Sequence, residues 1–322
     1  MKSVFVTGVN GLLGTNLTHQ LLHQGYFVKG LVRDKSRYKG QNDDRLQLIE
    51  GDLFDDFTKV MDGVDYVVHT AALTCQNLLD YNDYWKINGN ATIQLFHAAA
   101  KCNVKRFVFV STANTIGYGS LDAPGSEEVS IRQPFCSSYY AKSKKETEEY
   151  LLKNKHILET IIVNPTFLLG AYVSKPGSGK IVLMGWKRKI IIYPPGGKNF
   201  VHVEDVAQGI IKCFHNGRSG DRYILAGENL SYKDFFKRLN AVADQRPVMI
   251  KLPAGILIGI GVFGELLRML GLTSNLSMVN MKILCTGNYY SNKKSIKDLG
   301  MTYRPVDYAI AAALKYFKNG TG

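Results

Sequence analysis

Two side chains four residues apart could together move a proton: Tyr140 and Lys144. On a helix, residues at this spacing share a face. A free tyrosine has a pKa of about 10, and a nearby positive charge favours the phenolate. We therefore predict that Lys144 lowers the pKa of Tyr140, which then acts as a general acid or base. Tyr139 competes for this role, but the residue four positions after it is the uncharged Ser143.

Two neighbouring hydroxyl groups, those of Ser111 and Thr112, directly follow the apolar segment 107–110. If that segment is a strand of a parallel sheet, both hydroxyls lie at the carboxyl edge, where such sheets bind ligands. Either could donate a hydrogen bond to a carbonyl or alcohol oxygen of a substrate. Either could equally be an ordinary strand end, so the segment alone does not choose between them.

Three glycines, Gly8, Gly11 and Gly14, have the spacing of a nucleotide-binding turn. They follow the strand-like segment 3–7 and open a helical pattern. Glycine lets the backbone turn sharply and approach a phosphate closely, and free N–H groups at a helix start attract a pyrophosphate. We predict that this turn binds a nucleotide through Gly8, Asn10, Gly11, Leu12 and Gly14.

The residues after the second strand-like segment, 27–32, indicate which dinucleotide binds. An acidic residue there hydrogen-bonds the ribose 2′-hydroxyl of NAD, whereas an arginine accommodates the 2′-phosphate of NADP. Arg33 is the first residue beyond the segment, and Arg37 follows closely. We predict that NADP is preferred and keep NAD as the alternative, because Asp34 takes the acidic role if the strand ends one residue later.

The elements that must position these residues alternate between strand and helix over the first half of the chain. Short apolar, β-branched segments alternate with segments whose apolar residues recur at helical spacing. This order predicts an α/β fold, a Rossmann-type doubly wound parallel sheet. The expected strands are 3–7, 27–32, 46–49, 66–68, 107–110 and 161–163, and the expected helices are 12–23, 83–102 and 139–152.

The alternation changes after about residue 170, where the turn cluster 193–197 interrupts it. Helices are expected over 204–214, from a cap at Ser231 to about 243, and over 306–317. We predict a dinucleotide-binding Rossmann domain from 1–170 plus about 199–225. A smaller C-terminal substrate-binding lobe, 171–198 and 226–322, then closes over the carboxyl edge of the sheet.

Composition narrows the class of protein. The formal net charge is +13, but the basic residues are dispersed, and no zinc-finger spacing or aromatic–lysine pattern supports nucleic-acid binding. Five scattered cysteines without a Cys-x-x-Cys pair predict no metal site and reduced thiols in a cytoplasmic protein. The apolar segment 252–272 is interrupted by Pro253, Glu265 and Arg268, so we expect a packed helix rather than a membrane span, with a weak membrane-surface contact as the alternative.

Taken in order, the glycine turn, a hydroxyl near 112 and the Tyr140–Lys144 pair resemble the short-chain dehydrogenase/reductase superfamily. The resemblance is to its extended branch, the NAD(P)-dependent epimerase/dehydratase family, and within that to the enzymes of dihydroflavonol-reductase type. It spans nearly the whole chain. Further matching stretches are Gly51-Asp52-Leu53, 65–72, Asn164-Pro165, 201–207 and 292–300.

The resemblance implies roles for particular residues. Tyr140 would be the catalytic acid/base, and Lys144 would lower its pKa and bind the nicotinamide ribose. The family's Ser/Thr aligns best with Thr112, because a small residue, Ala113, follows it; Ser111 is the second choice. Asn88 matches an Asn that the family often has, although a structural cap or bend is an equal reading. Further cofactor contacts are expected from Asp52, Leu53, Thr70, Ala71, Ala72, Asn164, Pro165 and Thr166.

The reaction that the resemblance implies is reduction of a ketone or aldehyde by hydride transfer from NADPH. The first alternative is a nucleotide-sugar epimerase with tightly bound NAD, and the second is a non-catalytic NADP-binding sensor or scaffold. Branch members commonly form homodimers through the helices that here are 83–102 and 139–153. The substrate is expected in the irregular lobe, near Tyr172, Lys175, Lys180 and Trp186.

Overall fold

The computed structural model describes residues 1–75, 77–172, 177–272 and 274–319. Its centre is a sheet of seven strands, all parallel to their neighbours. The predicted parallel Rossmann-type sheet is therefore confirmed. In spatial order the strands are β10 (Arg222–Leu225), β6 (Thr160–Pro165), β5 (Arg106–Val110), β4 (Tyr66–His69), β1 (Ser3–Thr7), β2 (Phe27–Val32) and β3 (Leu46–Glu50).

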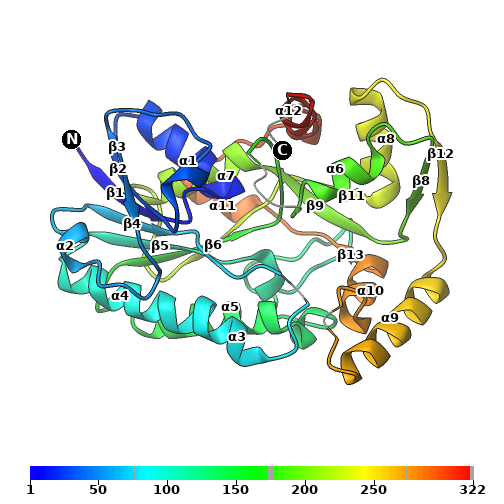
Figure 1. Cartoon of the computed structure of the whole chain (residues 1–322), viewed down its shortest axis with the longest axis horizontal. Coiled ribbons are helices and arrows are strands. Elements are labelled where there is room, and N and C mark those ends of the chain that lie inside the picture. Colours follow the sequence, from blue (N-terminus) through cyan, green and yellow to red (C-terminus); the bar gives the residue numbers. More distant parts are fainter. Residues whose placement is uncertain (76, 173–176, 273, 320–322) are drawn as a thin grey trace.

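Helices cover both faces of this sheet, which explains why its strands are almost continuously apolar (Figure 1). Two separate apolar cores result, one between the sheet and each helical layer. One layer consists of α1 (Leu12–His23), α7 (Val203–Cys213) and α11 (Lys293–Leu299). The other consists of α2 (Thr58–Met61), α3 (Tyr81–Trp85), α4 (Ala91–Lys101) and α5 (Tyr139–Lys153).

The order of the strands reverses between β1 and β4, because the chain adds β2 and β3 on one side and β4, β5 and β6 on the other. At such a point the loops that follow neighbouring strands diverge and leave a crevice at the carboxyl edge, where ligands bind. The glycine turn follows β1, residues 70–72 follow β4, and Ser111 and Thr112 follow β5. The topology thus brings three predicted site segments to one edge.

A second, smaller sheet begins at this same edge, since β7 starts two residues after Pro165, the last residue of β6. It contains β7 (Phe167–Leu169), β9 (Gly197–His202), β11 (Glu228–Ser231) and β13 (Gly287–Asn288). A third core packs it against α6 (Lys180–Gly185), α8 (Tyr232–Val242) and α12 (Val306–Lys318). The assignment of these parts to a cofactor domain and a substrate lobe stays a prediction.

A two-stranded sheet and a helical hairpin form the far end of the molecule (Figure 1, right). The strands are β8 (Ile190–Tyr193) and β12 (Val248–Lys251), and β12 leads into α9 (Ala254–Met269), which packs on α10 (Met278–Cys285). Among the described residues, no helix is long and apolar enough to cross a membrane.

The predicted single helix over 83–102 is wrong in one respect. The structure divides it into α3, a π-helical turn (Lys86–Asn90) and α4. A Cβ on Gly89 would lie 2.5 Å from the Trp85 ring, so a larger residue in the wider turn would force this ring to move. Helical periodicity misses this turn because one inserted residue leaves the apolar pattern on both sides intact.

Candidate functional site

The glycine turn after β1 is tightly packed against the start of α1 and the end of β4. Gly8 has a φ of +76°, and a Cβ on it would lie 2.8 Å from the Thr70 hydroxyl. A Cβ on Gly14 would lie 2.0 Å from the Gly8 carbonyl oxygen. No side chain caps α1, whose N-cap residue is Gly11. The turn therefore leaves space and free N–H groups, which is what a pyrophosphate requires.

The end of β4 is bonded to the end of β1. Thr70 donates a hydrogen bond to the Thr7 carbonyl oxygen (2.7 Å), and the Ala71 N–H donates to the Thr7 hydroxyl (3.3 Å). Thr70, Ala71 and Ala72 are half-buried beside the glycine turn. The structure thus places these three predicted cofactor residues next to Gly8.

Below this edge, His69 forms a contact that the sequence interpretation missed. Its Nδ1 lies 2.7 Å from the Thr7 hydroxyl and its Nε2 lies 2.9 Å from the Thr92 hydroxyl. The side chain is fully buried, and burial, with a smaller effect of the Lys144 charge, lowers the pKa of His69 to about 3. The neutral imidazole joins β1, β4 and α4 beneath the site.

The residues after β2 lie where the cofactor prediction requires them. β2 ends at Val32, so Arg33 is indeed the first residue beyond the strand. The Asp34 carboxylate accepts bonds from the backbone and hydroxyl of Ser36 and pairs with Arg37 at 3.2 Å. Arg33 and Arg37 are exposed, whereas Asp34 is engaged within its own turn.

Asp52 and Leu53 follow β3 at the same edge of the sheet. The Asp52 carboxylate accepts a hydrogen bond from the backbone N–H of Phe54 at 3.2 Å, and the side chain is exposed. Leu53 is half-buried against the core beneath α4. Their expected contact with a nucleotide base stays a prediction.

The structure brings Thr112 and Tyr140 together and separates Tyr140 from its competitor. Ser138 caps α5, and the helix turns Tyr140 inward, where only 9% of it is exposed, while 40% of Tyr139 is exposed. The phenol of Tyr140 lies close enough to the Thr112 hydroxyl for the two side chains to interact. Ser111 is buried too, but its hydroxyl has no partner among the described residues. Thr112 is thus the hydroxyl that contacts the phenol.

The expectation that Lys144 lowers the pKa of Tyr140 is wrong for this arrangement. Burial raises the pKa of Tyr140 to about 12; the neighbouring Thr112 side chain opposes this rise and the Glu148 charge adds to it. The Lys144 ammonium instead donates to the Val110 carbonyl oxygen at 2.8 Å and lies over the Phe109 ring. Burial lowers the pKa of Lys144 to about 7, and the Glu148 charge acts in the opposite direction.

Glu148 is the residue that the sequence interpretation missed. It lies four residues after Lys144 and is fully buried. One carboxylate oxygen accepts from the Thr115 hydroxyl and the Asn164 amide, both at 2.7 Å, and the other lies 3.7 Å from Arg222. The signal in the sequence is the four-residue spacing, which continues from Tyr140 through Lys144 to Glu148.

Two predicted asparagines are engaged inside the protein. The amide nitrogen of Asn164 lies within hydrogen-bond distance of Glu148, Thr115 and the Thr112 carbonyl oxygen. Asn88, in the π-helical turn, exchanges bonds with the Leu73 backbone and donates to the Ser143 hydroxyl at 3.0 Å. Asn88 therefore joins the loop after β4 to α5. Pro165 ends β6, and the Thr166 hydroxyl donates to Asn199.

The predicted substrate residues are dispersed. Tyr172 has ring contacts with His19 of α1 and Tyr316 of α12. Lys180 is exposed at the start of α6, and Trp186 ends that helix against the third core. Lys175 lies outside the described residues. Among the described residues, no group of three or more His, Cys, Asp or Glu is placed to hold a metal ion.

The chain is similar to known proteins over most of its length. The model of the NAD dependent epimerase/dehydratase family matches residues 4–226. A protein of Synechocystis sp., provisionally named dihydroflavonol 4-reductase, is 30% identical over 98% of this chain and 94% of its own length. The UDP-glucose 4-epimerase of Vibrio cholerae is 27% identical, over 78% and 79%. The crystal structure of gox2253 superposes with a TM-score of 0.84, at 27% identity over 99% of both chains.

Proposed function

Because the chain belongs to the NAD-dependent epimerase/dehydratase family of the extended short-chain dehydrogenase/reductase superfamily, we propose that it reduces a ketone or aldehyde with NADPH. Members of this kind are reductases or epimerases, and the chain is an enzyme of this type. One observation carries the choice of reduction. It is the similarity, over 98% of this chain, to a protein named as a dihydroflavonol 4-reductase. Tyr140 is buried at the carboxyl edge of the sheet beside Thr112 and is the residue that we propose donates the proton.

The residues at the sheet edge fit a dinucleotide. A side chain at Gly8 or Gly14 would fill the turn, and the start of α1 is not capped by a side chain. In the proposal, Gly8, Asn10, Gly11, Leu12 and Gly14 hold the pyrophosphate. Residues 70–72 and 164–166 line the path toward Tyr140, and Asp52 and Leu53 receive the base.

The proposed division of labour follows from the contacts of the buried hydroxyls. The bound cofactor supplies the hydride. Thr112 and Tyr140 lie close enough to interact, so both can donate to one substrate oxygen, on which negative charge develops in the transition state. Tyr140 then gives its proton to that oxygen. Ser111 has a buried hydroxyl without a partner among the described residues and is the alternative donor.

The preference for NADP rests on the turn after β2. Arg33 and Arg37 are exposed there. The Asp34 carboxylate accepts a hydrogen bond from Ser36 and forms an ion pair with Arg37. An acidic group that is occupied in its own turn is a poor acceptor for a ribose 2′-hydroxyl, whereas two exposed guanidinium groups suit a 2′-phosphate.

A second candidate, a nucleotide-sugar epimerase with tightly bound NAD, is favoured by Lys198 on β9. Its ammonium lies 5.1 Å from the centre of the Phe167 ring, and burial lowers its pKa to about 8. The neighbouring residue on β9, Asn199, accepts a hydrogen bond from Thr166, one of the predicted cofactor residues, so this part of β9 adjoins the proposed site. An anionic diphosphate would stabilise the charged form of this lysine. A non-catalytic sensor is less favoured, because such a protein has no need of the Thr112–Tyr140 pair.

The proposed assembly is a homodimer through α4 and α5, and the proposed location is the cytoplasm. The cellular location rests on the five cysteines, all of which are free thiols in the structure. The proposed partner in the reaction is a small molecule, with specificity set in the smaller lobe.

The test is a panel of aldehydes, ketones and nucleotide sugars assayed with NADPH and NADH, together with analysis of cofactor in the purified protein. Reduction with exchangeable NADPH supports the proposal. Retained NAD with epimerised sugar supports the second candidate. Tyr140→Phe should lose turnover yet bind cofactor as the unmodified enzyme does, and unchanged turnover in this variant contradicts both catalytic proposals.

A further inference from the structure

The outer side of α9 is apolar where a surface helix is expected to be polar. Ile256, Val262, Phe263, Leu266 and Met269 are each at least half exposed, and Met269 is 82% exposed. The only two charged residues of the helix, Glu265 and Arg268, pair with each other at 3.7 Å. Glu265 also accepts a hydrogen bond from the Met278 backbone, so the outer stripe carries no charge of its own.

The orientation of α9 is fixed by the glycines on its inner side. A Cβ on Gly264 would lie 2.0 Å from the Leu276 carbonyl oxygen, and one on Gly261 would lie 3.1 Å from the Met278 Cα atom. Only the glycine side of the helix can therefore approach α10. The large apolar side chains must face outward, so their exposure follows from the packing.

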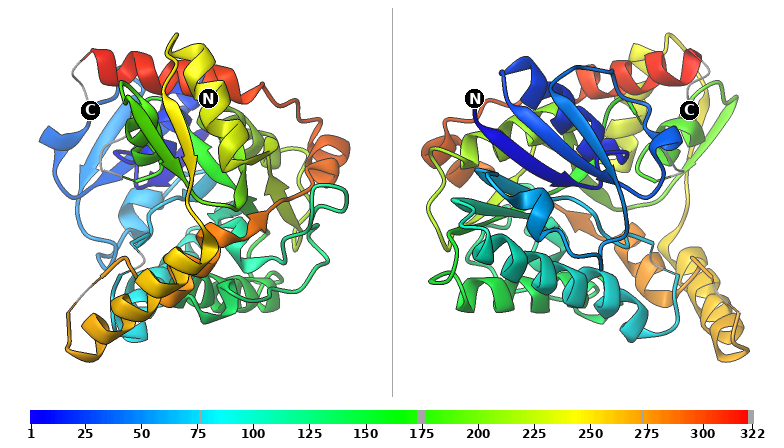
Figure 2. Two further views of the ribbon diagram at one scale, coloured as in Figure 1. Left: turned by 90° about the vertical axis from the view of Figure 1, so that its right-hand side faces the viewer. Right: turned by 60° about the vertical axis from the view of Figure 1, so that its left-hand side comes forward.

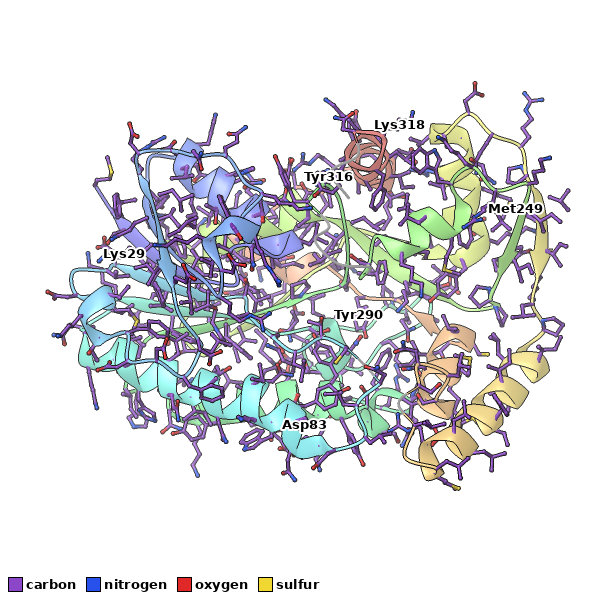
Figure 3. The ribbon with its side chains drawn as sticks, viewed as in Figure 1. Lys29, Asp83, Met249, Tyr290, Tyr316 and Lys318 are labelled. Carbon is purple, nitrogen blue, oxygen red and sulfur yellow. The ribbon has the colours of Figure 1, made fainter. Side chains whose placement is uncertain are left out.

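The two-stranded sheet beside α9 continues the same surface. Ile190 pairs with Val248 and Ile192 with Ile250, and these four side chains are between 47% and 61% exposed. The alternate residues of the strands pack into the third core, among them Met249, which Figure 3 labels on β12. Figure 2 (left) shows β8, β12 and α9 together on the side facing the viewer. We call the exposed apolar residues of these three elements the apolar end face.

Positive charges border the apolar end face. Residues 180–193 and 245–264 contain no Asp or Glu, but they contain six basic residues: Lys180, Lys187, Arg188, Lys189, Arg246 and Lys251. All six are exposed. Two acids adjoin these ranges, the exposed Asp244 and Glu265, which is paired with Arg268. A face that combines exposed apolar side chains with an excess of cations is complementary to an anionic lipid surface.

We propose that the apolar end face docks on an anionic lipid bilayer, with α9 lying in the interface. A bilayer requires no shape complementarity, which suits a face made of a helix beside two strands. A second copy of the chain is a poor occupant, because a two-fold contact would bring both sets of six cations together. Glu265 is already paired with Arg268 and offsets little of this charge. The inference is independent of the reaction proposed above.

The test is sedimentation of the full chain with vesicles of phosphatidylcholine alone and of phosphatidylcholine mixed equally with phosphatidylglycerol. We expect at least a tenfold larger bound fraction with the mixed vesicles, and its loss in high salt. Phe263→Asn combined with Leu266→Asn should abolish binding. The matched control, Leu121→Asn with Tyr308→Asn, removes equally exposed apolar groups elsewhere and should bind as before.

A second part of the experiment tests the cations beside the apolar end face with two triple variants that change the net charge equally. Replacing Lys187, Arg188 and Lys189 by Gln should weaken binding roughly 100-fold, since each cation near the surface contributes about a factor of five. Replacing Lys293, Lys297 and Lys315, which are exposed on α11 and α12, should have little effect.

Three results would overturn the proposal. One is absence of sedimentation with either vesicle, and another is an equal loss in variant and control. The third is a lipid-free dimer, measured by light scattering, that the Phe263 and Leu266 substitutions dissociate, because a second copy would then cover the face. Circular dichroism establishes that each variant is folded.

Discussion

At the scale of single residues, the electrostatics of the site depend on a carboxylate beneath the tyrosine. Glu148 shares the inner side of α5 with Tyr140 and Lys144 and is the charge that acts on both. It favours the protonated forms of the phenol and of the amine. We infer that Glu148 is a positioning residue, since it also holds Thr115 and Asn164 beneath the strand ends.

The family resemblance assigns the Lys144 ammonium to the nicotinamide ribose, so we propose that the rate falls when this ammonium loses its proton. We predict that Glu148→Gln moves the alkaline limb of the pH–rate profile to lower pH. Removing the carboxylate removes the charge that raises the pKa of Lys144. The pKa of Lys144 then falls below its present value of about 7, so the ammonium loses its proton at a lower pH. The measurement is kcat against pH between 5 and 9. Glu149→Gln is the control, because Glu149 is exposed and pairs with Lys145. An identical profile in both variants would refute the role of Glu148.

The buried His69 imidazole should make the stability of the fold depend on pH. Its folded-state pKa of about 3 lies below the ordinary value of 6.5, so the unfolded chain takes up a proton that the folded chain does not. Stability is therefore present above pH 6.5 and is lost as the pH falls toward 3. The loss approaches about 1.4 kcal/mol per pH unit. Denaturant unfolding at pH 7 and pH 5 should show it, and His69→Gln should flatten the slope, whereas exposed His156→Gln should not.

At the scale of elements, the junction between β1 and α1 is set by glycines that no other residue can replace. Gly14→Ala should destabilise the fold by about 1–3 kcal/mol through overpacking, because its Cβ would meet the Gly8 carbonyl oxygen. Gly259→Ala, in α9 with nothing within 4 Å, is the matched control. It should stabilise by about 0.5–1 kcal/mol. Thermal unfolding measures both, and equal effects would contradict the packing argument.

The arginines of the turn after β2 should determine the preference for NADPH over NADH. Arg33→Ala combined with Arg37→Ala should lower kcat/KM for NADPH by about 10- to 100-fold, since a charge-assisted hydrogen bond contributes about 1.5–3 kcal/mol. The value for NADH should change little. Lys35→Ala, exposed in the same turn, serves as the control. A similar loss with both cofactors would place the arginines outside the 2′-phosphate site.

At the scale of the whole molecule, the faces of the chain have different roles. The crevice at the carboxyl edge holds the proposed chemistry, the outer surface of α4 and α5 is the proposed dimer interface, and the apolar end face lies at the opposite end from the amino terminus (Figure 1). The +13 charge is accounted for in part by Arg33, Arg37 and the six cations at that end.

The dimer predicts a mass in solution twice the 35.9 kDa of the chain. Ile93→Arg, at a half-buried position of α4, should give a monomer because the charge would be buried between copies. Ile296→Arg on α11 should not, and sedimentation equilibrium distinguishes the two. A monomeric unmodified protein, or a dimer insensitive to Ile93→Arg, would exclude this interface.

Local sequence patterns are enough to predict the parallel sheet, the strand that ends at Val32, the cap at Ser231 and the helix face that Tyr140 shares with Lys144. These features depend on local backbone geometry: apolar runs, glycine spacing, capping side chains and the helical period. They are therefore visible in segments of a few residues, and the spacing of Gly8 and Gly14 belongs among them.

Only the tertiary structure decided the charge state of the candidate site. Lys144 reaches Val110 of β5, and Glu148 meets Asn164 of β6 and Arg222 of β10, so segments distant in sequence exclude water from α5. That exclusion raises the pKa of Tyr140 where pairing with Lys144 alone predicts a fall. The burial of a side chain depends on every segment that packs against it. The spacing of Tyr140 and Lys144 therefore predicts that they share a helix face, but it does not predict that other segments exclude water from both side chains.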